Sequence, residues 1–255
     1  SDVHVPLLDV RLPEHELDLF IAELNFVGRN ARDGFARIAP SVEACVMAQW
    51  HRAVEATLAS GAGAALGHAL EPEQQQLQVA QVLESYMMSR LHMTVYPWLQ
   101  HAHRHDDARL TELLHAMRFH TQDDLGIKPA YHCPLDDAVA EVRKIAAATT
   151  PLDKLLCMKR ACAHVNRAVQ RNLDARGGNV EDNQMATDDL IEQVIYAVTQ
   201  AYPHVSLLTD LRYIKRFHFV AVSTSALGFV LSNFEVAADS FLAKLGAGAG
   251  ASRLS

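Results

Sequence analysis

The chain has 255 residues, of which 49% are apolar and 21% charged, and its formal net charge is −7. This length and composition allow one large or two small globular domains with a substantial core. The acidic balance argues against a nucleic-acid-binding protein, because contact with phosphates requires a basic surface.

The ends of the chain and its cysteines suggest a cytosolic protein. No uninterrupted apolar run approaches the roughly 18–20 residues of a transmembrane helix. The first ten residues have no basic region ahead of an apolar one, so we expect no signal peptide. The chain begins with Ser1 rather than Met, which suggests a fragment of a longer protein. Its cysteines include no CxxC pair and are typical of reduced thiols, at Cys45, Cys133, Cys157 and Cys162.

The N-terminal part is predicted to form two helices. Glycine and proline are rare, and apolar residues recur at spacings of three and four. Residues 15–38 carry one such stripe, beginning at Leu17. Ser41 is expected to cap a second helix that ends near Ser60. Residues 61–73 form a linker of small residues that cannot pack extensively.

The rest of the chain is also predicted to be helical, which makes the fold class all-α. A third helix runs from Glu73 to about Gln100, and Pro97 is expected to bend or end it. Residues 176–185 form the clearest loop, and residues 246–255 a flexible tail. The remaining predicted helices are Asp107–Phe119, Leu135–Ala148, Pro151–Asp174, Thr187–Ala201, Leu207–Phe217 and Gly228–Leu245.

A histidine cluster, HAHRHDD at His101–Asp107, is the most conspicuous group of possible metal ligands. His101 and His105 are four residues apart, so a helix would place both imidazoles on one face, as a zinc-dependent enzyme could use. No third ligand has a recognisable spacing, and we favour a polar helix end with histidines near its last carbonyls. No phosphate loop, nucleophile elbow or metalloprotease helix is present, so neither a metal site nor a cofactor is predicted.

A pair of aspartates precedes an apolar stripe in MATDDLIEQVIYAV, at Met185–Val198. Asp189 and Glu192 have the spacing of a capping box, in which each side chain satisfies a backbone amide of the first turn. Asp188 is then left projecting from the helix start, where the positive end of the helix dipole favours a negative charge. For these residues alone, a helix cap is the simpler interpretation.

The surrounding blocks point to a specific family. Together they extend over about 160 residues: LESYMMSRLHMTVYPWL (Leu83–Leu99), MRFHTQDDLGIKP (Met117–Pro129), TPLDKLLCMKRACAHVNRAV (Thr150–Val169), TDDLIEQVIYAV (Thr187–Val198), LLTDLRYIKRF (Leu207–Phe217) and GFVLSNFEVAADSF (Gly228–Phe241). In order and content, they resemble the vacuolar protein sorting 9 domain, the exchange-factor module for early-endosomal Rab GTPases.

The resemblance implies an N-terminal helical bundle over residues 1–72, whose last helix can extend further, packed on an α-helical exchange domain over residues 73–245. It implies a cytoplasmic guanine nucleotide exchange factor, recruited to early endosomes, for a GTPase of the Rab-five type. In the family, the first Asp of the motif enters the nucleotide site of the GTPase, takes its P-loop lysine and disfavours magnesium; by position this is Asp188. The residues that the resemblance assigns to GTPase binding are Asp189, Ile191, Ile195, Phe229, Ser232, Asn233 and Asp210.

Three positions depart from the family pattern. Phe229 replaces a tyrosine, Glu192 replaces a proline, and Asp210 replaces an asparagine, which adds a negative charge. These departures motivate an alternative of a different class: a non-catalytic scaffold or adaptor on the same fold that binds a small GTPase or another trafficking partner.

Overall fold

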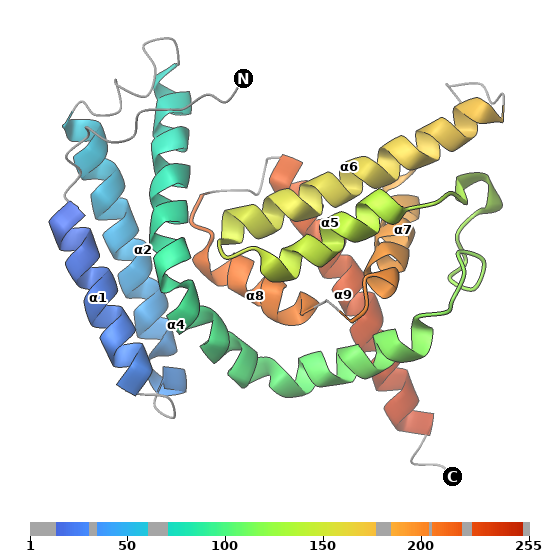
Figure 1. Ribbon diagram of the computed structural model, residues 1–255, viewed down its shortest axis with the longest axis horizontal. Coiled ribbons are helices and arrows are strands. Elements are labelled where there is room, and N and C mark those ends of the chain that lie inside the picture. The colour runs from blue at the N-terminus through green and yellow to red at the C-terminus, as the bar shows by residue number, and fades with distance from the viewer. Residues whose placement is uncertain are drawn as a thin grey trace. The chain divides into compact units, whose positions relative to one another are not determined.

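The computed structural model describes residues 14–30, 35–60, 71–176, 185–203, 206–220 and 226–251 (Figure 1). The described part of the chain is helical without a strand, which confirms the all-α fold class. Its elements are α1 (Glu14–Asn30), α2 (Phe35–Ala59), α4 (Pro72–Met117), the short 3-10 helix η1 (Pro129–Tyr131), α5 (Asp136–Ala147), α6 (Pro151–Ala175), α7 (Thr187–Gln200), α8 (Leu207–Phe217) and α9 (Ala226–Ala251).

The chain divides into two compact units. The first contains residues 1–98 and 216–220, and the second contains residues 99–215 and 221–255. Helix α4 therefore contributes to both units, and the exchange domain expected over residues 73–245 includes parts of both.

In the first unit, side chains tie α1 and α2 to the beginning of α4. The indole Nε1 of Trp50 donates a hydrogen bond to the carbonyl of Ala80 at 3.0 Å. Asp18 on α1 accepts hydrogen bonds from the hydroxyl of Tyr86 at 2.9 Å and from Arg90 at 2.6 Å. These bonds help to fix how the three helices pack, and Asn25 of α1 adds polar contacts with Arg90 and Thr94 of α4.

In the second unit, α5 packs along α6, and α9 packs against both α6 and α7. Helix α6 begins as its sequence predicts, because the Thr150 hydroxyl accepts the amide of Asp153 at 3.0 Å and Pro151 occupies the first turn. The helices share one apolar core, whose fully buried members include Leu155, Met158, Val165, Phe234 and Phe241.

Helix α9 is strongly apolar, although it contains no long uninterrupted apolar run. Among the described residues, its segment Ala226–Leu245 is long and apolar enough by composition to cross a membrane, with a mean hydropathy of 1.3. Val230, Phe234 and Phe241 follow one face and are buried in the core of the second unit. Core packing thus accounts for part of the hydropathy of this helix.

Helix α4 differs from its prediction. It continues past Pro97 to Met117, so the third helix does not end near Gln100 and no separate helix begins at Asp107. A proline inside a helix costs about 3 kcal/mol, whereas burial of each large apolar side chain contributes about 1.5–3 kcal/mol. Val95 and Leu99 are fully buried on either side of Pro97, which makes the continuous helix favourable.

Other boundaries also moved. Helix α2 begins at Phe35, so Ser41 lies inside it and does not cap its start. Helix α9 continues to Ala251, which makes the first part of the expected flexible tail helical. Most of the linker expected at residues 61–73 lies outside the described residues, and its last two residues, Pro72 and Glu73, instead begin α4. Most of the loop expected at residues 176–185 also lies outside the described residues.

Candidate functional site

The start of α7 separates the two adjacent aspartates. Ala186 is the N-cap residue, so Thr187, Asp188 and Asp189 occupy the first three helical positions. Oδ2 of Asp189 accepts the backbone amide of Ala186 at 3.2 Å. The sequence predicts Asp189 as the cap of a box closed by Glu192. The structure corrects this: the cap is Ala186, three residues before Asp189, and Asp189 is the acid that reaches back to the cap.

Asp189 is also neutralised from outside its own helix. Its side chain is only 6% exposed, and its Oδ1 lies 2.7 Å from Nζ of Lys128, which precedes η1. The hydrogen bond from Lys128 to Asp189 raises the pKa of the lysine, and the attraction between the two charges adds to the shift. A buried carboxylate requires such partners, and Asp189 has one for each oxygen.

Asp188 differs from Asp189 in both its exposure and its contacts. Its side chain is exposed, and within the described part of the chain it makes no hydrogen bond or ion pair. It lies in the first turn of α7, where the helix dipole favours an anion. Asp189 thus serves the helix start, and Asp188 faces solvent.

Partly exposed apolar residues accompany Asp188. Ile191 and Ile195 follow it on α7, and both are half-buried. Phe229, with 50% of its surface exposed, and the exposed Ser232 lie on α9, which packs against α7. The structure therefore places these predicted residues on two adjoining helices.

Three predicted contact residues point into the protein instead. Asp189 is held as described, and Asp210 is 1% exposed because its carboxylate pairs with Nζ of Lys154 at 2.8 Å. Asn233 is 2% exposed, and its Nδ2 has no hydrogen-bond partner among the described residues. These three side chains were expected to contact a GTPase directly, but they lie in the interior of the protein. Asp210 adds no surface charge, since it neutralises Lys154.

Comparison with known proteins identifies this arrangement. The Vacuolar sorting protein 9 (VPS9) domain family matches residues 135–245, which contain α5 to α8, most of α9 and both aspartates. The chain contains a VPS9 domain. This confirms the resemblance noted from the sequence; the blocks at Leu83–Leu99 and Met117–Pro129 lie before the matched residues. The VPS9 family consists of guanine nucleotide exchange factors for Rab GTPases.

A curated relative agrees with this assignment. The chain is 26% identical over 163 residues to Vacuolar protein sorting-associated protein 9A of Oryza sativa subsp. japonica. The aligned region covers 63% of this chain and 32% of the rice protein, so the chain spans about a third of that relative's length.

Side chains that the sequence did not single out hold the segment at residues 118–134 on the VPS9 domain. Gln193 and Gln200 of α7 donate hydrogen bonds to the carbonyls of Tyr131 at 2.9 Å and His120 at 3.2 Å. From α6, Asn172 donates to the carbonyl of His132 at 2.9 Å. In the sequence, Gln193, Gln200 and Asn172 stand out only as polar residues within largely apolar helices. Nothing in the sequence marks Lys128 as a residue that contacts α7.

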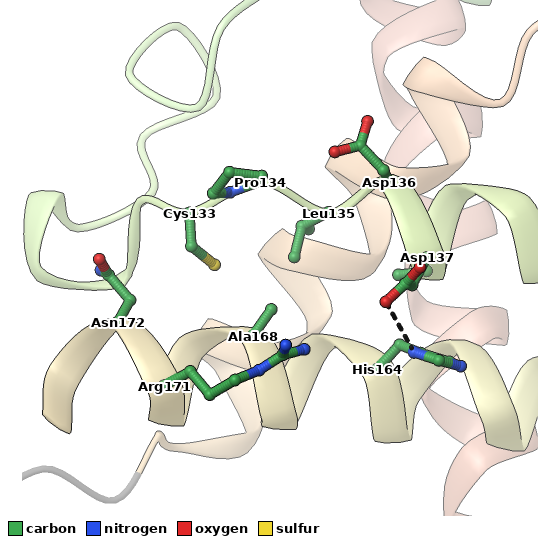
Figure 2. Close-up of a pocket in the computed structure, with 10 residues that line it drawn as sticks. Cys133, Pro134, Leu135, Asp136, Asp137, His164, Ala168, Arg171 and Asn172 are labelled. Atoms are coloured by element: carbon green, nitrogen blue, oxygen red, sulfur yellow. Dashed lines mark ion pairs between the residues drawn. The ribbon is translucent and has the colours of Figure 1, made fainter. Parts of the chain in front are cut away.

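A hollow of about 400 Å³ lies between the start of α5 and α6 in the VPS9 domain (Figure 2). Its lining includes a cysteine and a histidine, the residue types of a nucleophilic site. Cys133 and His164 line it, but Figure 2 shows them at opposite ends. Nδ1 of His164 lies 3.6 Å from Oδ2 of Asp137, and burial raises the pKa of the Cys133 thiol. A nucleophilic cysteine requires a nearby base and a lowered pKa, so this hollow lacks both.

The histidine cluster gains no support as a metal site. Within the described ranges, no group of three His, Cys, Asp or Glu side chains could hold a metal ion. His101 and His105 are exposed on α4, well before its end at Met117. The favoured interpretation, histidines at a helix end, is therefore also corrected, because the helix continues past them.

Proposed function

We propose that this chain accelerates GDP release from an endosomal Rab GTPase of the Rab-five type, with Asp188 as the carboxylate that enters the nucleotide site. The family indicates Rab exchange in general, and the type of Rab rests on the sequence resemblance. The observation that carries the proposal is the contrast at the start of α7: Asp188 is exposed and unengaged within the described residues, while Asp189 is buried and paired.

The chemistry of the GTPase explains why one exposed carboxylate is effective. A Rab holds its nucleotide through P-loop amides, a lysine and a magnesium ion around the phosphates. A carboxylate at that site pairs with the lysine and competes with the phosphates for it. Because the two binding events are coupled, a factor that binds the empty GTPase more tightly must weaken nucleotide binding to the same extent.

A carboxylate in the nucleotide site can lower the barrier to GDP release by the amount that exchange requires. Shortening nucleotide release from hours to seconds requires a barrier lower by roughly 4–5 kcal/mol. Charge-assisted hydrogen bonds to a desolvated lysine, together with loss of magnesium, can contribute on this scale. The remaining contacts only need to dock the GTPase, and for this we propose Ile191, Ile195, Phe229 and Ser232. The exchange domain is proposed to extend over residues 73–245 of a cytoplasmic protein recruited to early endosomes.

The test is release of fluorescent GDP from a panel of purified Rabs. Wild-type protein should accelerate release from an endosomal Rab, and Asp188→Ala should remove most of this acceleration with an unchanged melting temperature. Asp136→Ala is the matched control, because Asp136 is also an exposed aspartate in the first turn of a helix, α5. A wild-type protein that is inert toward every endosomal Rab would show that the proposal is wrong.

The alternative is a scaffold or adaptor that binds a small GTPase or another trafficking partner without exchange. It is favoured by Phe229, which presents an exposed ring without the family's hydroxyl, and by Glu192 in place of the family's proline. Under this alternative, the protein binds the GDP-bound, GTP-bound and nucleotide-free Rab with equal affinity. The exchange proposal instead requires tighter binding to the nucleotide-free form.

A further inference from the structure

We infer that Lys128 is a positioning residue for exchange: by pairing with Asp189, it fixes the start of α7 and thereby the place of Asp188. This inference rests on the proposed function. Lys128 does not touch the GTPase in this scheme and acts only through α7.

The backbone on both sides of Lys128 is anchored. Gly126 has a φ of +78°, a left-handed conformation that favours glycine, and its amide donates to the carbonyl of Asp123 at 3.0 Å. Ile127 follows with 3% exposure and donates its amide to Gln122 at 3.0 Å. Beyond Lys128, the carbonyl of Pro129 accepts a hydrogen bond from Arg176 at 3.0 Å. The lysine thus extends from a fixed base.

The carboxylate of Asp189 links this fixed base to the first turn of α7. One oxygen binds Nζ of Lys128, and the other binds the amide of Ala186. Both bonds must form together, so they restrict the rotamer of Asp189 and the direction in which the helix begins. Successive helical residues are rotated by about 100°, so Asp188 is held on a different side, facing solvent.

Loss of Lys128 would change this balance. An almost fully buried carboxylate without its cation pays a desolvation cost, which the chain can relieve by unwinding the first turn and exposing Asp189. Asp188 would then lose its defined position. Catalytic groups are sensitive to such shifts, since a misplacement of about 1 Å can cost on the order of a hundredfold in rate.

The ion pair of Lys128 and Asp189 also affects the net charge at the start of α7. Lys128 is a cation at the start of α7, and a lysine that paired with Asp188 would cancel the charge meant for the P-loop lysine of the GTPase. Because Asp189 binds Lys128 at 2.7 Å, the lysine is engaged away from Asp188. The pair of Lys128 and Asp189 leaves one net negative charge at the helix start.

The chain offers a closely matched control. On α5, Nζ of Lys144 lies 2.6 Å from Oε1 of Glu141, and the two side chains are 60% and 8% exposed. The corresponding values for Lys128 and Asp189 are 63% and 6%. Both pairs therefore join an exposed lysine to a buried carboxylate, but only one lies at the start of α7.

The experiment compares Lys128→Met, Lys128→Arg and Lys144→Met in the fluorescent-GDP assay, using a Rab on which the wild type is active. We expect Lys128→Met to lower kcat about tenfold with little change in KM, because most of the proposed docking residues, Ile195, Phe229 and Ser232, lie beyond the first turn of α7. Lys128→Arg should retain at least about half of kcat, since the guanidinium can also bind the carboxylate. Lys144→Met should match the wild type. Amide hydrogen exchange at residues 187–191 should rise only in Lys128→Met.

Each outcome has a defined meaning. If the wild type is active and Lys128→Met has the same kcat as Lys144→Met, the inference is overturned and the proposed function stands. A wild type that is inert overturns both. If Lys128→Met does not fold, Asp189→Asn replaces it, because the amide keeps an acceptor for Ala186. This variant should lower kcat about tenfold with normal folding, and an unchanged kcat would overturn the inference.

Discussion

Lys154 and Asp210 form an ion pair in the interior of the second unit, with Nζ 2.8 Å from Oδ1 and side-chain exposures of 0% and 2%. The same Nζ donates a hydrogen bond to the carbonyl of Ile145 at 2.7 Å. The lysine of α6 thus joins α8 to α5. Two charges withdrawn from water in this way are stable only while each keeps the other.

We predict that Asp210→Asn destabilises the protein, although it restores the residue of the family pattern. The amide would leave the charge of Lys154 uncompensated, and breaking a buried pair on one side costs about 3–5 kcal/mol. Urea denaturation followed by circular dichroism measures the free energy of unfolding. The double variant Asp210→Leu/Lys154→Met should recover most of the loss. Equal stability of Asp210→Asn and the wild type would mean that Lys154 does not depend on this carboxylate.

We predict that Phe229→Tyr strengthens exchange without changing stability. The ring is half exposed on α9, so an added hydroxyl can reach solvent or a bound GTPase without displacing core atoms. One regained hydrogen bond contributes about 0.5–1.5 kcal/mol, which corresponds to a rate increase of about twofold to tenfold.

The measurement for Phe229→Tyr is kcat/KM for GDP release, with the melting temperature as the check on folding. Val236→Tyr is a control on the same helix, since Val236 is similarly exposed at 43%. Equal exchange by the wild type and Phe229→Tyr would favour the scaffold alternative.

The sequence predicted the helices whose boundaries depend on nearby residues. Helix α8 was expected and found at Leu207–Phe217, and α7 begins at Thr187 as expected. The apolar repeat and first-turn residues that define such helices lie within one short segment. The course of α4 was not predictable in this way, because its continuation past Pro97 depends on burial by distant parts of the chain.

The sequence could indicate which aspartate of the proposed site remains at the surface. Asp188 could be separated from Asp189 because one of two adjacent acids at a helix start can bond the backbone there, which leaves the other acid over. Asp210 was misjudged because lysines are almost never fully buried, so nothing marked Lys154 as a charge that needed an internal partner. Lys128 was missed because its contact with α7 is formed by the folded chain and has no signature in the local sequence.

The last prediction concerns acid stability and Glu141, which accepts hydrogen bonds from Lys144 at 2.6 Å and Arg160 at 2.7 Å. Burial acts to raise the pKa of Glu141, but these two hydrogen bonds outweigh it, so the pKa falls below its usual value of 4.5. A lowered pKa stabilises the folded state above the unfolded value, and this stabilisation is lost as pH falls through the folded pKa. The wild type should therefore exceed Glu141→Gln in urea midpoint at pH 7, and the difference should shrink steadily below pH 4.5. A difference that stays constant from pH 7 to pH 3 would show that the ionised carboxylate contributes nothing.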